Sequence, residues 1–160
     1  MKFEHLIEIN DPANPLLGRL TRAQLWRGLV MRAQDPQPFM LGLDDCRILD
    51  RSADGIVREL HFGQVVIRDR VKFEHGQRVR YLTEAPSELA GASLVMTIEE
   101  PGPQQLFVRF EYCNDASGQA EAAEPFYDDI RRSAYTKADI DTIRGIRLYA
   151  SEGLLDIATA

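Results

Sequence analysis

The strongest hydrophobic pattern lies near the C-terminus of the chain, between Thr136 and Gly153. Apolar residues recur there at the spacing of one helix face, at Ile140, Ile143, Ile146, Ala150 and Leu154. Thr136, followed three positions later by Asp139, is typical of a helix N-terminus, and Gly153 is favoured at the left-handed position after a helix. The pattern predicts a long amphipathic helix whose apolar face the preceding strands must cover.

The N-terminal part predicts one strand and one helix. Apolar residues and His5 alternate with polar residues over 3–9, which is the period of a strand with one buried face. Thr21 and Gln24 form a capping-box pattern, and Pro36 and Pro38 end the helix that it opens. The apolar stripe of this helix comprises Leu25, Trp26, Leu29, Val30 and Ala33.

From residue 46 onward the pattern is that of strands, which we place at 46–52, 56–63, 65–74, 77–83, 93–99 and 105–113. Ala53-Asp54-Gly55 and Glu74-His75-Gly76 are typical of three-residue loops with a left-handed glycine, and Pro101-Gly102-Pro103 of another turn. One side of the sheet is apolar, including Val65, and the other is mostly charged. A short helix over 125–134 then precedes the long one. This order predicts one α+β domain over residues 1–160.

Four polar residues, which we call the polar row, fall on the apolar side of the predicted sheet. The loop lengths place Asp50 opposite Arg58, Arg58 opposite Asp69, and Asp69 opposite Tyr81. Buried charges must be paired or solvated. One interpretation is a structural ion-pair row near an open end of the sheet. The other is the polar end of a cavity that holds a carboxylate, phenol or enolate of a mostly apolar ligand.

Three further residues allow both a structural and a functional interpretation. His5 is either a core residue or an acid/base group in a cavity. Trp26 is either a core side chain or a pocket wall. Arg147 lies at the edge of the C-terminal apolar stripe, where it either extends its guanidinium to solvent or reaches an anionic ligand.

Composition and charge narrow the possible partners. The 160 residues carry a formal net charge of -6, with a pI near 5.1, which argues against nucleic acid and anionic membranes. Because the chain has neither a signal-peptide pattern nor an apolar run long enough to span a bilayer, we expect a cytoplasmic protein. Cys46 and Cys113 are expected to be reduced, structural thiols.

The chain lacks the motifs of metal, nucleotide and nucleophile chemistry. His61 lies on the predicted solvent side and His75 in a loop, so the histidines have no metal-ligand spacing. No P-loop, Gly-x-Gly-x-x-Gly or Gly-x-Ser-x-Gly pattern is present. We expect no metal and no cofactor. Any catalysis would be general acid/base or electrostatic, carried out by the polar row or His5.

The order of elements carries a family resemblance, together with three phrases: Thr21-Arg-Ala-Gln-Leu-Trp26, Arg58-Glu-Leu-His-Phe-Gly63 and Ala138-Asp-Ile-Asp-Thr-Ile143. The chain resembles the AtaL-like branch of the START and birch-pollen-allergen superfamily over nearly its whole length. This resemblance implies the helix-grip fold, in which a curved antiparallel sheet grips a long C-terminal helix around a hydrophobic cavity. It brings no catalytic motif, and fold alone does not define function.

The leading hypothesis is a carrier or binder of a small, mostly hydrophobic molecule between the last helix and the sheet. Beside the polar row, His5, Trp26 and Arg147, its predicted walls are Leu60, Val71, Tyr81, Met96, Val108, Phe110, Ile143 and Ala150. The alternative is a cyclase, dehydratase or isomerase acting on a polyketide or aromatic substrate. A third is an interaction module with a packed centre. The missing motifs favour a binder over an enzyme, and the oligomeric state is left open.

Overall fold

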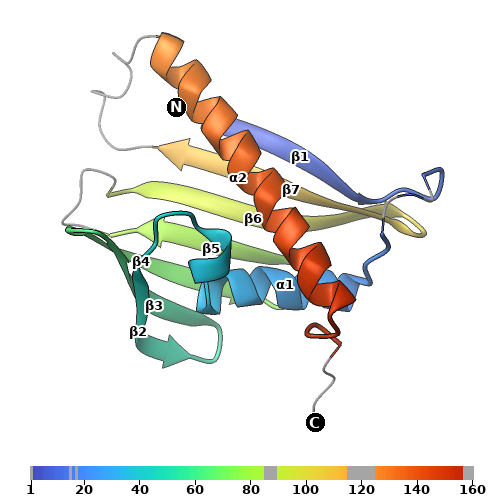
Figure 1. Cartoon of the computed structure of the whole chain (residues 1–160), viewed down its shortest axis with the longest axis horizontal. Helices are drawn as coiled ribbons and strands as arrows, with labels where there is room; N and C mark the ends of the chain where they lie inside the picture. Colours follow the sequence, from blue (N-terminus) through green and yellow to red (C-terminus); the bar gives the residue numbers. More distant parts are fainter. Residues whose placement is uncertain (1, 15, 17, 85–89, 115–124, 157–160) are drawn as a thin grey trace.

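A computed structural model describes residues 2–14, 16, 18–84, 90–114 and 125–156, without the side chains of 114 and 125–128. Seven antiparallel strands form one sheet in the order β1-β7-β6-β5-β4-β3-β2 (Figure 1). Their bounds are β1 (Lys2–Asn10), β2 (Asp45–Ser52), β3 (Gly55–Phe62), β4 (Val65–Glu74), β5 (Arg78–Thr83), β6 (Ala92–Gly102) and β7 (Gln105–Asn114). The predicted α+β class and strand number are confirmed.

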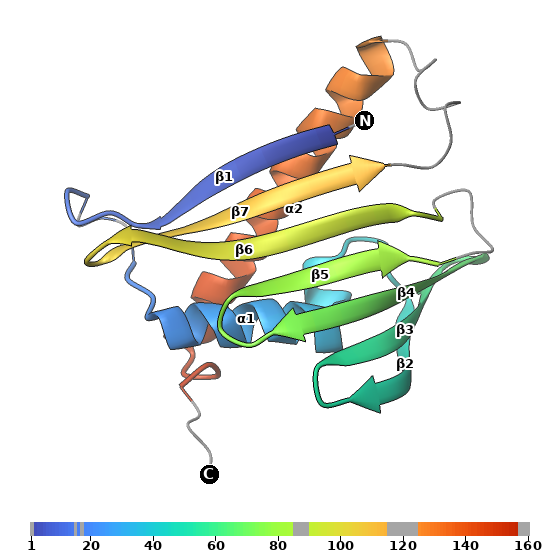
Figure 2. The same ribbon diagram turned by 180° about the vertical axis from the view of Figure 1, so that it is seen from behind.

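The helices lie on one side of this curved sheet. They are α1 (Arg22–Gln34), the short 3-10 helix η1 (Gln37–Phe39) and α2 (Pro125–Ser151). Figure 1 shows α2 crossing the sheet diagonally, and Figure 2, seen from behind, shows both α1 and α2 beyond the strands. The opposite side of the sheet therefore faces water. None of the helices in the described part of the chain has the length and apolar character needed to cross a membrane.

Helix α1 forms as its sequence predicts. The Thr21 hydroxyl accepts a hydrogen bond from the backbone N–H of Gln24 at 3.0 Å, and the Gln24 side chain accepts one from the N–H of Thr21 at 2.8 Å. This reciprocal capping box satisfies two N–H groups that a helix start leaves without partners. The helix ends at Gln34, before Pro36. Its buried face, which includes Leu25, Leu29 and Ala33, packs into the concave side of the sheet.

Helix α2 differs from the prediction at its start and in its buried face. It is continuous from Pro125 to Ser151, so Thr136 is not an N-cap and the short helix predicted over 125–134 is part of α2. Ile140 and Leu154 are exposed. The buried positions are Asp139, Thr142, Ile143 and Ile146. Ile143 and Ile146 lie on the buried face as predicted, but this face is shifted toward Asp139 and Thr142. Apolarity alone could not locate these two polar residues, whose hydrogen bonds replace those lost to water.

The C-terminus of α2 confirms the role predicted for Gly153. Gly153 has φ +77, and its N–H donates to the carbonyl of Ala150 at 3.1 Å. The next N–H, of Leu154, reaches back to the carbonyl of Tyr149 at 3.0 Å. These two bonds form a Schellman motif, whose left-handed residue is easiest for glycine.

The strand register confirms one of the three predicted pairings in the polar row. Arg58 lies opposite Asp69, as the tight turn between β3 and β4 predicts. Gly76 is left-handed, with φ +70, but Glu74 pairs with Arg78, so the loop lies one residue later than predicted. As a result Thr83 lies opposite Asp69.

A loop shorter than predicted removes Asp50 from the polar row. Ser52 pairs with Gly55, so the loop consists of Ala53 and Asp54, and Gly55, the first residue of β3, is not left-handed. This register places Asp50 opposite Val57 instead of Arg58, and a β-bulge between Ile48 and Asp50 then brings Ile48 opposite Arg58. Because a shift of one residue turns side chains to the other face, Asp50 is exposed on the outer side.

A smaller prediction about the sheet is also wrong, and another holds only in part. The β6–β7 turn consists of Pro103 and Gln104, since Gly102 pairs with Gln105. Gln104 takes the left-handed conformation there, with φ +64. Val65 lies on the inner side as predicted, in alternation with Asp69 and Val71, but it is exposed at the end of β4.

A second register shift lies in β1, between Glu8 and Asn10. The Asn10 side chain is buried beyond it and exchanges two hydrogen bonds with the backbone of Leu20, at 2.6 and 3.0 Å. Both edge strands of the sheet, β1 and β2, are therefore interrupted by a bulge.

The two long helices meet at a glycine. A Cβ built on Gly28 of α1 would lie 2.5 Å from Cγ2 of Ile146, which is fully buried on α2. Helix η1 approaches α2 similarly, because a Cβ on Gly145 would lie 2.9 Å from the Phe39 ring. The absence of a side chain at Gly28 thus sets how closely the helices approach.

We predict that Gly28→Ala destabilises the protein. Alanine favours a helix over glycine by about 1 kcal/mol, but the new methyl group overlaps Ile146, and overpacking costs about 1–3 kcal/mol. Denaturant unfolding should show a net loss of stability that shrinks in the Ile146→Ala background. Gly18→Ala is the control, because a Cβ at this position would lie 3.9 Å from the nearest atom, Nη1 of Arg147. An equal effect of both alanines would contradict the proposed close contact.

Candidate functional site

A buried ion pair crosses the concave side of the sheet between β3 and β4. Arg58 donates from Nε to Oδ1 of Asp69 at 2.9 Å and from Nη2 to Oδ2 at 2.6 Å, and from Nη1 to the carbonyl of Ala33 at 2.9 Å. Arg58 is 2% exposed and Asp69 is 5% exposed. Burial alone would lower the pKa of Arg58, but Asp69 outweighs it and raises that pKa. This pair remains charged and joins the sheet to α1.

Tyr81, on β5, lies beside this pair. The Cζ atoms of Arg58 and Arg32 lie 5.1 and 5.3 Å from the centre of its ring, within the range of cation–π attraction. Its ring is buried, and its hydroxyl has no hydrogen-bond partner among the described residues. Leaving a buried hydroxyl unpaired costs about 1–3 kcal/mol, so this oxygen is an open position for a polar partner.

Arg32 reaches the same region from the last turn of α1. It is 8% exposed, and its one hydrogen bond within the described part of the chain runs from Nε to the hydroxyl of Thr142 on α2, at 3.2 Å. Its two terminal nitrogens form no hydrogen bond there. A buried guanidinium presents five N–H donors, so most of the donors of Arg32 remain available.

A second polar group lies between β1, β7 and α2. Oδ2 of Asp139 is 3.4 Å from Nδ1 of His5, and Oδ1 accepts a hydrogen bond from the hydroxyl of Tyr112. Asp139 is almost fully buried, whereas His5 is half-buried. The Asp139 carboxylate thus contacts both a ring nitrogen of His5 and the hydroxyl of Tyr112. A carboxylate at one ring nitrogen fixes the orientation of an imidazole.

Burial is the main cause of the raised pKa values in this group. It raises the pKa of Asp139, although hydrogen bonds from Tyr112 and His5 act in the opposite direction. Burial and the negative charge of Asp139 also raise the pKa of Tyr112 far above its ordinary value. Arg32 lowers both pKa values slightly, so its charge acts on this second group as well. Tyr112 therefore remains a phenol donor.

Aromatic rings surround these polar groups. Tyr112 stacks on Tyr135 with ring centres 4.0 Å apart and planes 7° from parallel. Phe3, on the same strand, lies 6.2 Å from the His5 ring, and Phe110, on the neighbouring strand β7, lies 6.4 Å from it. The half-buried imidazole thus has an aromatic environment and a buried carboxylate at Nδ1, and its Nε2 has no hydrogen-bond partner among the described residues.

The predicted site residues fall into several places. His5, Arg58, Asp69 and Tyr81 lie on the concave side, and Asp50 lies outside it. Arg147 donates to the backbone carbonyls of Gly18 and Ile9, so its guanidinium is held by the chain. The predicted apolar walls mostly belong to the core, namely Val71, Met96, Val108, Phe110 and Ile143, with Ala150 packed against it and Leu60 buried on β3. Their role in binding a ligand remains a prediction.

Four polar residues of the site were not selected from the sequence: Arg32, Tyr112, Asp139 and Thr142. Asp139 was assigned to a helix cap, and Arg32 lies next to the apolar stripe of α1. The signal that could have identified them is their spacing, since Asp139, Thr142 and Ile146 share one helix face with Ile143. Arg32 likewise lies one turn after Gly28 and Leu29.

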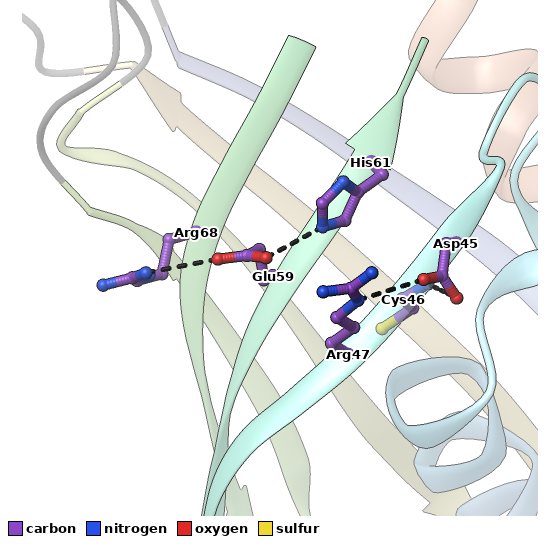
Figure 3. A network of polar contacts seen from close by, with 6 residues as sticks. All are labelled: Asp45, Cys46, Arg47, Glu59, His61 and Arg68. Atoms are coloured by element: carbon purple, nitrogen blue, oxygen red, sulfur yellow. Dashed lines mark hydrogen bonds and ion pairs between the residues drawn. The ribbon is translucent and has the colours of Figure 1, made fainter. Parts of the chain in front are cut away.

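The outer face carries a separate and more exposed network, shown in Figure 3. Glu59 accepts from Nη2 of Arg68 at 3.2 Å and lies 2.8 Å from Nε2 of His61. The bond with His61, followed by that with Arg68, lowers the pKa of Glu59. On the neighbouring strand, Arg47 pairs with Asp45 at 3.3 Å. Of these contacts, Arg68 with Glu59 joins β4 to β3 on the water-facing side, and the other two lie within β3 and within β2.

Neither cysteine is in a disulfide, and burial raises the pKa of the Cys46 thiol, so this group is predominantly protonated near neutral pH. Among the residues that the structure describes, no three His, Cys, Asp or Glu side chains converge as a metal site would require.

The curved seven-stranded antiparallel sheet, with a long C-terminal helix across its concave side, is the helix-grip fold that the resemblance implied. A family model described as "Acetylaranotin biosynthesis cluster protein L" matches residues 7–153, and the chain belongs to this AtaL family. No curated protein matches the chain.

Solved structures share the fold at low identity. The Aha1 dimer from Colwellia psychrerythraea matches with a TM-score of 0.61 at 13% identity, covering 92% of this chain and 96% of that one. The aromatase/cyclase ZhuI from Streptomyces sp. R1128 matches at 0.59 and 14%, covering 94% and 93%. The di-domain aromatase/cyclase StfQ of the steffimycin pathway matches at 0.68 and 11%, covering 94% of this chain and 51% of that one. At such identities the similarity shows the fold.

We predict that Asp69→Asn destabilises the fold by about 3 kcal/mol, because removing one partner leaves a buried cation uncompensated. Denaturant unfolding at neutral pH measures the loss. Replacing both partners, as Arg58→Met with Asp69→Leu, should recover much of it. Glu59→Gln is the control in the exposed network, and should change stability little because water solvates Arg68. A small effect of Asp69→Asn would contradict the assignment of a charged, buried pair.

Proposed function

We propose that this protein binds a small, largely apolar molecule on the concave side of the sheet, facing α2. The ligand carries one anionic or hydrogen-bond-accepting group. That group accepts hydrogen bonds from the Tyr81 hydroxyl and the terminal nitrogens of Arg32. The aromatic side chains near β1 and β7 contact the apolar body of the ligand. The AtaL family and the aromatase/cyclase neighbours support a small-molecule ligand of this kind.

The observation that carries the proposal is the unpaired Tyr81 hydroxyl beside an incompletely paired Arg32. A protein interior normally pairs such groups, and exceptions need an explanation. A carboxylate, phenolate or enolate oxygen would pair with both donors at once, and charge-assisted hydrogen bonds of this type are among the stronger ones. Arg58 is unsuited to that role because its guanidinium already donates to the Asp69 carboxylate and to the carbonyl of Ala33.

Two matched probes test this assignment. Isothermal titration with 2-naphthoate and with neutral 2-naphthamide compares the same ring system with and without a charge. We predict that Arg32→Gln weakens naphthoate binding about tenfold, with a smaller effect on the amide, because a hydrogen bond to a charged group is worth about 1.5–3 kcal/mol. Tyr81→Phe should weaken both.

Arg51→Gln serves as the control, because it removes the same positive charge at an exposed position of β2. It should leave both affinities unchanged. Native mass spectrometry of protein purified from its own organism should also reveal a co-purifying small molecule. If neither probe binds and no small molecule co-purifies, the proposal is overturned in favour of an interaction module with a packed centre.

A second candidate function rests on the His5–Asp139–Tyr112 group. With its proton on Nδ1, facing the carboxylate, His5 would present Nε2 as a base, and Asp139 would stabilise the imidazolium that forms. Such a base could remove a proton next to a ligand carbonyl while Arg32 and Tyr81 stabilise the enolate. This is the acid/base chemistry of a cyclase, dehydratase or isomerase.

The probe 5-nitrobenzisoxazole tests for this base. Nε2 of His5 would take the proton from C3, the C–H electrons would form the nitrile, and the N–O bond would break to give a coloured phenolate. We predict that His5→Asn lowers the rate at least tenfold, since general-base catalysis contributes about 10²–10⁴-fold. Asp139→Asn should lower it as well.

Tyr135→Phe is the control for this experiment, because it keeps the stacked ring while changing neither His5 nor Asp139. A wild-type rate equal to that of His5→Asn at every pH would exclude the catalytic candidate. Binding of the naphthyl probes would then stand as the function.

A further inference from the structure

A groove of about 780 Å³ runs along the outward face of α1, on the opposite side of this helix from the core. Residues that recur along one helix face, from Arg22 to Asp35, form its floor. The β4–β5 turn, at His75 and Gly76, borders it on one side. The segment after α2, at Leu154 and Leu155, also borders it. Its volume lies within the range of about 300–1,000 Å³ typical of small-molecule sites.

The floor of this α1 groove is apolar. Trp26, Val30 and Met31 lie along it, and the exposed Leu154 extends the apolar surface to the wall. The indole is held in place by edge-on contacts with Phe73, 6.4 Å away, and with His75, 5.7 Å away. Trp26 is thus both part of the core and part of a preformed groove.

One cation in the groove has no acidic partner. Arg27 donates from Nη1 to the carbonyl of Leu155 at 2.6 Å, and no ion pair involves it within the described residues. Arg22, by contrast, is engaged by Glu100 at 3.1 Å and by the carbonyl of Gly76 at 2.9 Å. Arg27 is therefore a positioned, unneutralised guanidinium next to apolar surface, and its remaining donors suit an acidic oxygen.

We propose that the α1 groove is a second ligand site, which binds a small amphipathic anion. The aromatic or aliphatic body lies over Trp26, Val30 and Met31, and the acidic group pairs with Arg27. This site is separate from the concave side, because the buried face of α1 lies between them. The apolar area beside the unpaired Arg27 favours a small anion over a neutral molecule. Asp35 also lines the groove, eight positions further along the chain, so the acidic group of the ligand lies at the Arg27 end.

A single resonance tests the site, because Trp26 is the only tryptophan of the chain. The full-length, ¹⁵N-labelled protein is titrated with 1-anilinonaphthalene-8-sulfonate and, separately, with N-phenyl-1-naphthylamine, which lacks the sulfonate. We predict that both probes shift the indole N–H cross-peak and that the sulfonate binds more tightly. Arg27→Gln should weaken sulfonate binding about tenfold and leave the neutral probe unchanged.

Two variants of matched chemistry locate the probe. Met31→Glu adds a negative charge to the groove and should weaken the sulfonate more than tenfold, whereas Leu148→Glu makes the same kind of change at a 56% exposed position of α2 and should have no effect. Arg51→Gln controls for the loss of one positive charge.

An indole resonance that does not move would overturn the proposal. So would binding that is lost in Arg32→Gln but unchanged in Arg27→Gln and Met31→Glu, since the probe would then occupy only the concave side and the proposed function would stand. Sedimentation that shows a dimer dissociated by Met31→Glu would assign the groove to a second copy of the chain and equally contradict a small-molecule site.

Discussion

The bidentate contact between Arg58 and Asp69 connects more of this structure than any other polar interaction described here. It spans β3 and β4, ties the sheet to the end of α1 through Ala33, and provides the surface against which Tyr81 lies. Each charge depends on the other, because neither has water to replace its partner. The position of α1 on the concave side, and with it the position of Arg32, follows from this contact.

The inward side of α2 extends the same polar character along the sheet. A helix that only had to cover a core would present apolar residues there, yet Asp139 and Thr142 are buried beside Ile143 and Ile146. Each has a specific partner on another element, Tyr112 or Arg32. Local departures from an apolar core are expected where a protein performs its function. This is the physical reason to place the site at the meeting of β1, β5, β7 and the two helices.

Local rules predicted those parts of the fold that depend on a few neighbouring residues. The capping box at Thr21, the left-handed Gly153 and the β3–β4 pairing of Arg58 with Asp69 are of this kind. The errors arose where tertiary contacts decide the outcome. Partners far along the chain made Asp139 an inward residue, and a β2–β3 loop one residue shorter than predicted turned Asp50 outward.

The same limit applies to the candidate site. Arg58, Asp69, Tyr81 and His5 were selected because polar residues interrupt an apolar strand face. Arg32 was missed because helical polar residues are common at the edge of a stripe, and only its burial distinguishes it. The unpaired state of the Tyr81 hydroxyl is likewise a property of packing.

The two bulged edge strands affect how the molecule meets other copies of itself. An open sheet ends in rows of unpaired N–H and C=O groups, which can recruit a strand from a neighbour and begin aggregation. The interruptions near Asn10 and Asp50 break the regular spacing that such recruitment needs. Both margins of the sheet thus carry a backbone irregularity of the kind that hinders edge-to-edge pairing between copies.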